Sequence, residues 1–155
     1  MRDSSLSWQK KLAQGFSSAS ELLTFLELPK QATSMAELQF PSRIPLGFAR
    51  RMQKANLNDP LLLQVLALDT ELSDTVGYVP DPLAEAKSNV QKGIIHKYHG
   101  RVLLTLTGVC AVNCRYCFRR HFPYQTNNPG RGGWKDSIAY IAKDSSITEV
   151  ILSGG

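Results

Sequence analysis

The sequence predicts an α/β fold, with a mostly helical amino-terminal region over residues 1–95 and the first βα units of a partial α/β barrel over residues 96–155. Two apolar runs in the second region, 102–106 and 147–152, have the length and composition of buried strands. A Gly/Pro-rich loop, 127–133, and a helical pattern separate them. Strand, loop, helix and strand in this order predict a right-handed crossover between parallel strands.

Short helices are expected in the amino-terminal region, because apolar residues there follow helix-start signals. Ser20 is the expected N-cap of a first helix that ends before Pro29. A second helix is expected over residues 48–52. Asp59 and Pro60 supply an acidic N-cap and a proline at the first helical position before a leucine-rich run. We expect these helices to serve packing.

The elements of the second region follow from prolines and apolar periodicity. Residues 77–89 include two prolines and predict an extended loop. The run 102–106 is so apolar that we expect a strand buried on both faces, as in a parallel sheet. In the following helix, Trp134, Ile138 and Ile141 recur at i, i+4 and i+7 and predict a single apolar face.

All three cysteines of the chain, Cys110, Cys114 and Cys117, lie in one short segment. An odd number of cysteines this close together does not make a disulfide framework, whereas three soft thiolates suit a shared metal ion or an iron–sulfur cluster. A cubane cluster held by three thiolates keeps one iron open to a small molecule. The segment follows the carboxyl end of the first predicted strand, where α/β barrels place their active sites.

A zinc site is the alternative use of these cysteines. His121 lies four positions after Cys117 and would complete a Cys3His set with the three thiolates. Spacing alone leaves both interpretations open. The apolar run that leads into Cys110 favours the barrel enzyme, because small zinc modules lie among turns and polar residues.

The length of the chain bears on how much of a barrel it holds. An α/β barrel needs roughly 200 residues or more, and this chain has 155. We therefore expect an amino-terminal fragment of a longer enzyme, which stops at Ser153–Gly154–Gly155 after the second strand. A complete small α+β domain is the alternative.

Composition and charge narrow the class of protein. Hydrophobic residues make up 43% and charged residues 20% of the chain, as in globular proteins. No apolar run approaches the ~20 residues of a membrane span, and the start lacks the apolar core of a signal peptide. The net charge of +5 is modest and bases cluster only beside the cysteines, so we expect no nucleic-acid partner. A cytoplasmic protein without a membrane partner is expected, since a reducing compartment suits free thiolates.

The C-x3-C-x2-C spacing, with Tyr116 before the last cysteine, resembles the signature of the radical S-adenosylmethionine (radical SAM) enzymes. The surrounding segment, His96–Tyr124, resembles the lysine 2,3-aminomutase family, and most closely its members that serve (R)-β-lysylation of elongation factor P. Residues 58–62 and 81–83 and the Ser-Gly-Gly ending fit the same family. The likeness extends from about residue 45 to the end of the chain.

This resemblance implies a radical SAM barrel and its cofactors. The three cysteines would ligate a 4Fe–4S cluster, whose open iron would bind S-adenosylmethionine. Tyr116 would pack near the adenine of that cofactor. Gly154 and Gly155 would be the first two positions of a Gly-Gly-acidic motif that contacts its amino group.

The resemblance also assigns the basic residues on either side of the cysteines. Arg101 and Lys97 would hold the phosphate of pyridoxal phosphate, for which the bidentate geometry of a guanidinium is well suited. Arg119 would bind the carboxylate of the substrate lysine, and Arg120 would support it. The pyridoxal-binding lysine of the family would lie outside this chain, so no catalytic residue is expected within it.

The implied activity is that of an isomerase, an intramolecular aminotransferase that converts lysine to β-lysine. A ligase would attach β-lysine to elongation factor P, and an electron donor such as flavodoxin would reduce the cluster. The fragment alone is expected to be inactive. Two alternatives stay open: another radical SAM enzyme, such as an RNA methyltransferase that needs no phosphate clamp, and a Cys3His zinc module that binds nucleic acid.

Overall fold

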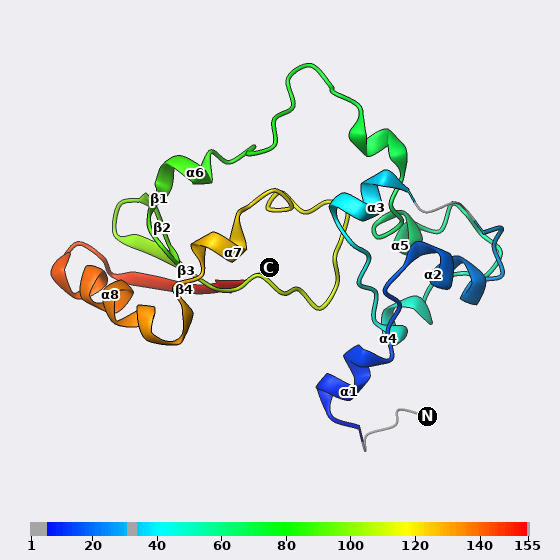
Figure 1. Cartoon of the computed structure of the whole chain (residues 1–155), viewed down its shortest axis with the longest axis horizontal. Coiled ribbons are helices and arrows are strands. Elements are labelled where there is room, and N and C mark those ends of the chain that lie inside the picture. Colours follow the sequence, from blue (N-terminus) through cyan, green and yellow to red (C-terminus); the bar gives the residue numbers. More distant parts are fainter. Residues whose placement is uncertain (1–5, 31–33, 155) are drawn as a thin grey trace. The chain divides into compact units, whose positions relative to one another are not determined.

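The computed structural model describes residues 6–30 and 34–154, and Figure 1 labels its helices and strands. None of the helices within these residues is long and apolar enough to cross a membrane. The helices are α1 (Trp8–Ala13), α2 (Ala19–Phe25), α3 (Met35–Gln39), α4 (Leu46–Ala49), α5 (Pro60–Leu63), the 3-10 helix η1 (Asp69–Leu72), α6 (Glu85–Ser88), α7 (Tyr124–Asn127) and α8 (Gly130–Lys143). The strands are β1 (Asn89–Gln91), β2 (Ile94–Tyr98), β3 (Arg101–Thr107) and β4 (Glu149–Gly154). This mixture of helices and sheet fits the predicted α/β class.

The chain divides into two compact units. The helical unit consists of Met1–Val76 and Ala111–Cys117, and the sheet unit consists of Gly77–Cys110 and Phe118–Gly155. The short segment 111–117 therefore belongs with the helical unit, although both of its neighbours in sequence belong to the sheet unit. The expected domains, 1–95 and 96–155, stay a prediction.

The helical unit has its own apolar core. Two leucines of α2 and its C-cap Leu26 are fully buried and pack with residues of α5 and of the turn that follows it. The largest members of this core are Leu22, Leu23, Leu26, Ile44, Leu62 and Val65. The leucine-rich runs of the sequence thus serve packing, as predicted.

The N-cap of α2 is Ser18 and not the predicted Ser20. Ser18 has an extended backbone, and its hydroxyl oxygen accepts a hydrogen bond from the N–H of Glu21 at 3.2 Å. Ser20 lies inside the helix, where its N–H and C=O belong to helical turns. The helix predicted over 48–52 is the short α4, which ends at Ala49.

The helix start predicted at Asp59 is confirmed. Its carboxylate accepts hydrogen bonds from the N–H groups of Leu61 at 2.9 Å and Leu62 at 3.0 Å, in the first turn of α5, and from that of Gln53 at 2.9 Å. These bonds, that of Gln53 first, lower the pKa of Asp59 below its ordinary value of 3.8. Asp59 therefore ties α5 to the segment before it. The helix ends at Leu63, so only the first part of the leucine-rich run is helical.

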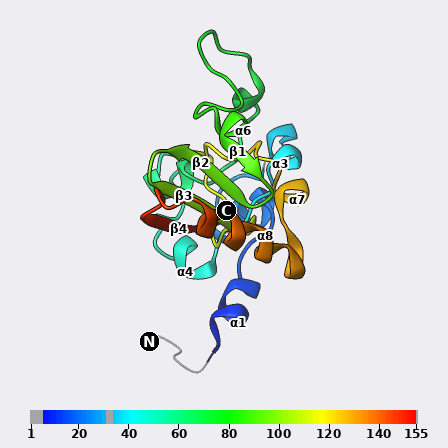
Figure 2. The same cartoon turned by 90° about the vertical axis from the view of Figure 1, so that its left-hand side faces the viewer.

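The sheet has the order β1-β2-β3-β4, and the four strands lie side by side in both views (Figures 1 and 2). The first three strands pair antiparallel, whereas β3 and β4 pair in parallel, with Val102 opposite Val150 and Leu104 opposite Leu152. The chain passes through α8 between the two parallel strands. The predicted parallel pairing of two strands joined through a helix is therefore confirmed, within a mixed rather than a purely parallel sheet, and the right hand of the crossover stays a prediction.

The sheet presents two different faces. Trp134 and Ile141 of α8 pack against one face, on three buried side chains, those of Ile94, Val102 and Leu104. Successive side chains of a strand alternate between the faces. Leu103 and Ile151, which are opposite each other in the register, therefore lie on the face opposite α8.

Burial within the sheet unit is lower than predicted. Strand β3 is not buried on both faces, because Leu103 is only half-buried and Leu106 is exposed. The apolar residues 150–152 of β4 are also exposed. Ile138 is 62% exposed, because it lies at the edge of the α8 stripe that Trp134 and Ile141 define. Leu103 and Ile151 are less buried than predicted because α8 covers only the other face of the sheet. Val150 and Leu152 share the α8 face with Val102 and Leu104, but they lie on β4, an edge strand.

The hairpin of β1 and β2 was not predicted. Its turn contains Gly93, whose φ of +81° lies in the left-handed region that favours glycine. A Cβ atom at this position would lie 3.1 Å from Pro129 and 3.2 Å from the ring of Trp134. Glycine therefore permits both the turn and the close approach of α8 to the hairpin.

Both predicted loops are shorter in the structure. The expected loop 77–89 contains α6 and the first residue of β1. The expected loop 127–133 ends early, because α8 begins at Gly130 despite its glycine-rich first turn. Pro129 packs so closely against this turn that residue 133 has to be glycine: a Cβ atom on Gly133 would lie only 2.6 Å from the Cβ atom of Pro129.

The carboxylate of Asp59 should make the stability of the helical unit depend on pH. We expect Asp59→Ala to lower the melting temperature at pH 7, because three N–H groups lose their acceptor. Since folding lowers its pKa, the contribution of Asp59 is present above pH 3.8 and is lost as the pH falls through the lower, folded-state value. The difference in melting temperature should therefore shrink in strong acid. Thermal unfolding followed by circular dichroism measures it, with the exposed Asp74→Ala as the control.

Candidate functional site

The cysteine segment starts just beyond the carboxyl end of β3, as the sequence predicts. Cys110, Cys114 and Cys117 are free thiols, and each is half-buried. The N–H of Cys117 donates to the carbonyl of Cys114 at 3.2 Å and closes a turn. Tyr116, inside this turn, is 94% exposed. Three free thiols of similar exposure on such a short segment form a donor set suited to a soft metal centre.

The three thiols are divided between the units. Cys110 belongs to the sheet unit, whereas Cys114 and Cys117 belong to the helical unit. Across residues 6–30 and 34–154, no three side chains of His, Cys, Asp or Glu come close enough together to hold a metal ion. His121, the fourth ligand of the zinc alternative, belongs to the sheet unit. The fit to a cluster therefore rests on the chemistry and spacing of the donor set.

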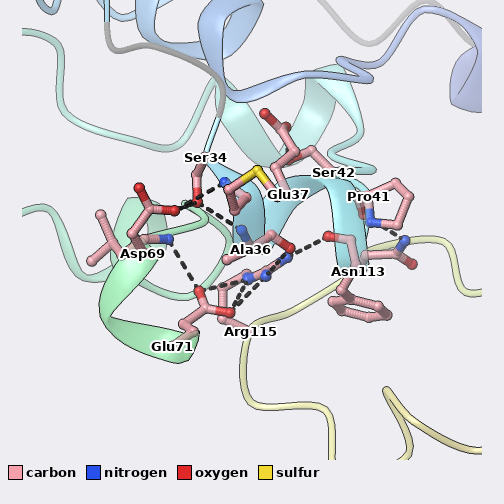
Figure 3. Close-up of polar contacts among 12 residues, drawn as sticks. Ser34, Ala36, Glu37, Pro41, Ser42, Asp69, Glu71, Asn113 and Arg115 are labelled. Atoms are coloured by element: carbon pink, nitrogen blue, oxygen red, sulfur yellow. Dashed lines mark hydrogen bonds and ion pairs between the residues drawn. The ribbon is translucent and has the colours of Figure 1, made fainter. Parts of the chain in front are cut away.

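Arg115, between the second and third cysteines, is the most strongly bound residue of the segment (Figure 3). Its guanidinium is 7% exposed and forms a two-pronged ion pair with Glu71 of η1, with Nη2 2.6 Å from Oε2 and Nε 2.9 Å from Oε1. Nη1 donates to the carbonyl of Phe40 at 2.7 Å, and Nη2 donates to that of Ala36 at 3.2 Å. The guanidinium also lies over the Phe40 ring, 5.1 Å from its centroid.

The backbone of the segment is bound to the helical unit as well. The N–H of Asn113 donates to the carbonyl of Arg43 at 3.0 Å, and its side-chain Nδ2 donates to that of Pro41 at 2.9 Å. The N–H of Arg115 donates to the carbonyl of Gln64 at 2.7 Å. Val112 packs against the leucine core. These contacts explain why residues 111–117 group with the helical unit.

A second set of polar contacts fixes the partners of Arg115 (Figure 3). Asp69, at the start of η1, accepts hydrogen bonds from the Ser34 hydroxyl at 2.7 Å and from the N–H of Met35 at 2.9 Å. The Ser34 bond is the first cause of the lowered pKa of Asp69. The buried carboxylate of Glu37 accepts from the N–H of Ala19 at 2.7 Å. The helices α3 and η1 thus hold Arg115 from two sides.

The two residues predicted to bind phosphate lie beside one cavity of the sheet unit. This cavity, of about 150 Å³, is called the Arg101 cavity; Arg101, Lys97, Tyr98, Glu85, Leu103 and Ile151 line it, among others. The Arg101 guanidinium is paired with Glu149, which is opposite it in the register, and about half of it is exposed. Nζ of Lys97 donates to the carbonyl of Leu83. The pair of cations suits an anionic group, although Arg101 already has a carboxylate beside it.

Arg119 lies at the other end of the sheet, next to the end of β4. Its Nε and Nη2 each lie 2.7 Å from a carboxylate oxygen of Glu85, and its Nη1 donates to the hydroxyl of Ser153 at 3.1 Å. The side chains of Arg119 and Glu85 are 10% and 9% exposed. The guanidinium lies 5.1 Å from the centroid of the Phe118 ring. Its pKa is raised above the ordinary value, mainly by the hydrogen bonds to Glu85.

A second cavity adjoins this ion pair. It has about 120 Å³ and is called the Arg119 cavity; Glu85, Arg119, Asp81, Phe118, His121 and Phe122 line it, among others. Glu85 lines both cavities. The Arg101 cavity extends from Arg101, at the start of β3, to Leu103 and Ile151, in the middle of β3 and β4. Arg119 lies further along, beside Ser153 near the end of β4, so Glu85 lies between the two cavities.

The remaining predicted residues are placed as follows. Gly154 ends β4, and a Cβ atom there would lie 2.6 Å from Cγ2 of Thr107, so the pairing of β4 with β3 requires glycine at this position. Gly155 lies outside the described residues. Arg120 is half-buried in the sheet unit, beside Arg119 in sequence. The structure thus brings Arg119 to the end of β4 that carries Gly154, and it places Arg101 and Lys97 at the other end.

Sequence reasoning did not identify Glu71 or Glu85, and it did not identify the structural role of Arg115. The two ion pairs join residues 44 and 34 positions apart, so no local pattern connects the partners. The only available signal was an acidic residue in each of two segments otherwise rich in leucine or proline. That signal is too common to select Glu71 or Glu85.

Comparison with known proteins identifies relatives of this chain. No protein-family model matches it. The L-lysine 2,3-aminomutase of Escherichia coli (strain K12) is 43% identical over 152 residues, which are 96% of this chain and 44% of that protein. The enzyme of the same name from Haemophilus influenzae is 42% identical over 151 residues, with 96% and 45% covered. That from Buchnera aphidicola is 40% identical over 152 residues, again with 96% and 45% covered.

This chain spans less than half the length of these curated relatives. An alignment that covers 96% of this chain includes the cysteine segment and both ion pairs. Identity of 40–43% over such a stretch reflects common descent rather than a shared short motif. By its sequence, this chain belongs to the lysine 2,3-aminomutase family.

Proposed function

We propose that this chain contributes the cluster-binding part of an isomerase that converts lysine to β-lysine. The observation that carries the proposal is the identity of 40–43% with three proteins named L-lysine 2,3-aminomutase over 96% of the chain. The free, half-buried thiols of Cys110, Cys114 and Cys117 support it, because they supply three soft ligands directly after a strand.

The three thiolates would hold a 4Fe–4S cluster with one iron open to S-adenosylmethionine, as in radical SAM enzymes. When bound, these groups would supply a carbon-centred radical that removes a hydrogen atom, and pyridoxal phosphate would carry the amino nitrogen that migrates. The exposed ring of Tyr116 is available to cover the adenine, and Gly154 leaves the end of β4 free of a side chain for the cofactor's amino group.

The face of the sheet opposite α8 would face the interior of a radical SAM barrel. Its charged side chains support this, since an isolated sheet face of a soluble domain is not expected to gather buried arginine and glutamate. On this face Arg101 and Lys97 would bind the phosphate of pyridoxal phosphate. Arg119 would bind the carboxylate of lysine, with Arg120 as a second cation.

The biological setting is proposed from the resemblance of the segment 96–124. In this setting, a ligase would transfer β-lysine to elongation factor P, and a reductant such as flavodoxin would supply the electron that reduces the cluster. The three free cysteines agree with a reducing, cytoplasmic location. Analysis of elongation factor P by mass spectrometry in cells that lack this protein tests this setting, because the β-lysine modification should be absent.

The cysteine segment should bind an iron–sulfur cluster rather than zinc. Anaerobic reconstitution with iron and sulfide should give broad visible absorption, and Cys110→Ala, Cys114→Ala or Cys117→Ala should each abolish it. His121→Ala is the control and should retain the absorption, since His121 is a ligand only in the zinc alternative. One zinc ion per chain and no visible band would contradict the proposal.

Arg115 should be required for loading of the cluster. Arg115→Ala removes the ion pair with Glu71 and the donors to the carbonyls of Phe40 and Ala36, and it frees the turn between Cys114 and Cys117. We expect a lower melting temperature and several-fold less iron per chain after reconstitution. The control Lys54→Ala breaks an exposed ion pair with Glu27 and should change neither quantity. Full iron content in Arg115→Ala would show that the loop forms its cluster without this contact.

Arg101 should be required for binding of pyridoxal phosphate in the full-length enzyme. Loss of a charge-assisted contact to phosphate costs about 1.5–3 kcal/mol, so Arg101→Ala should weaken binding roughly tenfold to a hundredfold. The iron content should stay at the wild-type level, because Arg101 and Cys110 flank opposite ends of β3. Glu149→Gln is the matched variant: it removes the carboxylate beside Arg101 and should leave binding equal or tighter. Unchanged affinity in Arg101→Ala, measured by fluorescence titration, would place Arg101 outside the cofactor site.

A further inference from the structure

Glu85 and Arg119 form a buried pair on the face of the sheet opposite α8, and neither the sequence motifs nor the names of the relatives assign a role to Glu85. We infer that Glu85 is a positioning residue, which holds the Arg119 guanidinium in the orientation that binds the carboxylate of lysine. The inference rests on the proposed function, in which Arg119 is the carboxylate-binding residue.

The pattern of hydrogen bonds on the guanidinium is the first argument. An arginine has five N–H donors in one plane. Glu85 occupies the edge formed by Nε and Nη2, with both contacts at 2.7 Å, and Ser153 accepts from Nη1. The other two N–H groups belong to Nη1 and Nη2, one on each. Tyr124 is a further hydrogen-bond partner of Arg119, so a second carboxylate would bind through the N–H group that Glu85, Ser153 and Tyr124 leave.

Burial is the second argument. A buried guanidinium is costly unless a charged partner and hydrogen bonds compensate for its lost hydration. With the two side chains 10% and 9% exposed, Glu85 supplies both the countercharge and two of the acceptors. The plane of the Arg119 guanidinium is thus fixed before any ligand binds. Ligand binding therefore does not have to pay the entropy of ordering this side chain.

The backbone under Glu85 is also fixed, which favours a positioning residue over a movable gate. Asp81 accepts hydrogen bonds from the N–H groups of Glu85 at 2.9 Å and Ala86 at 3.0 Å, at the start of α6. These bonds, that of Ala86 first, lower the pKa of Asp81. Glu85 therefore projects from a held turn and does not lie on a loose loop.

The position of Glu85 between the two cavities is the third argument. It lines the Arg101 cavity together with Lys97 and Arg101, and it lines the Arg119 cavity together with Arg119 and His121. A single carboxylate thus lies between the cations proposed to bind phosphate and the cation proposed to bind the substrate. Its pairing with Arg119 directs this negative charge away from the phosphate end.

The test is recognition of the lysine carboxylate by the full-length enzyme loaded with its cofactors. Calorimetry measures the affinity for lysine and for lysinamide, in which the carboxylate is replaced by a neutral amide. In the wild type, lysine should bind at least tenfold more tightly than lysinamide. In Glu85→Gln, which keeps the shape but loses the charge, this preference should fall about tenfold, with the iron content and bound pyridoxal phosphate unchanged. Glu85→Asp, which keeps the charge on a shorter side chain, should recover part of the preference.

Two further variants separate a positioning role from a purely structural one. Arg119→Lys should abolish the preference by itself, and Glu85→Gln should have no further effect on it in the Arg119→Lys background, because the two act through one guanidinium. Glu27→Gln removes the acid of the exposed Lys54 pair and should leave the preference at the wild-type value. A wild-type preference in Glu85→Gln, or a lower melting temperature as its only change, would overturn the inference. If Arg119→Lys retains the preference, or if the wild type does not bind lysine, the proposed function itself fails.

Discussion

The buried guanidinium of Arg115 is the interaction on which the arrangement of the cysteine segment depends. A charge that is 7% exposed has to recover its lost hydration from the protein. It does so through Glu71 and through the backbone carbonyls of Phe40 and Ala36. Because those partners come from α3, η1 and the link after α3, the contact draws residues 111–117 into the helical unit. The helical region, which the sequence marks only as packing, thereby becomes the support for two of the three thiols.

The sheet unit follows a different constraint, the alternation of side chains along β3 and β4. One set, Val102 and Leu104 with Ile94, is buried under α8 and supplies the apolar core. The other set lies on the opposite face. Arg101, Leu103 and Ile151 line the Arg101 cavity, Glu149 pairs with Arg101, and Ser153 accepts a hydrogen bond from Arg119. The crossover through α8 therefore covers one face of the sheet with the apolar core and leaves the opposite face to the candidate site. The apolar core and the residues of the proposed site thus lie on opposite faces of the same two strands.

The parts of this architecture that were predictable are those with local signals. Three features were predicted from residues that are close together in sequence: the Asp-Pro start of α5, the apolar runs of β3 and β4, and the helical stripe between them. The missed parts depend on partners far apart in sequence. The β1–β2 hairpin needs Gly93 to fit against Pro129 and Trp134, and the two buried ion pairs join residues 44 and 34 positions apart. The cysteines and Arg119 could be selected as site residues from motif and resemblance, but the acids that hold Arg115 and Arg119 could not.

The two buried arginines lie two residues on either side of Cys117, and each is held within its own unit. Arg115 is bound by Glu71 in the helical unit, and Arg119 is bound by Glu85 and Ser153 in the sheet unit. The chain passes from one unit to the other directly after Cys117. Since the two ion pairs share no residue, the loss of one leaves the contacts of the other intact, and their effects on the protein should be separable. One pair then serves the thiols and the other serves the end of β4. Under the proposed function, the short segment Arg115–Arg119 would combine a metal-binding role with a substrate-binding role, and each role would have its own set of contacts.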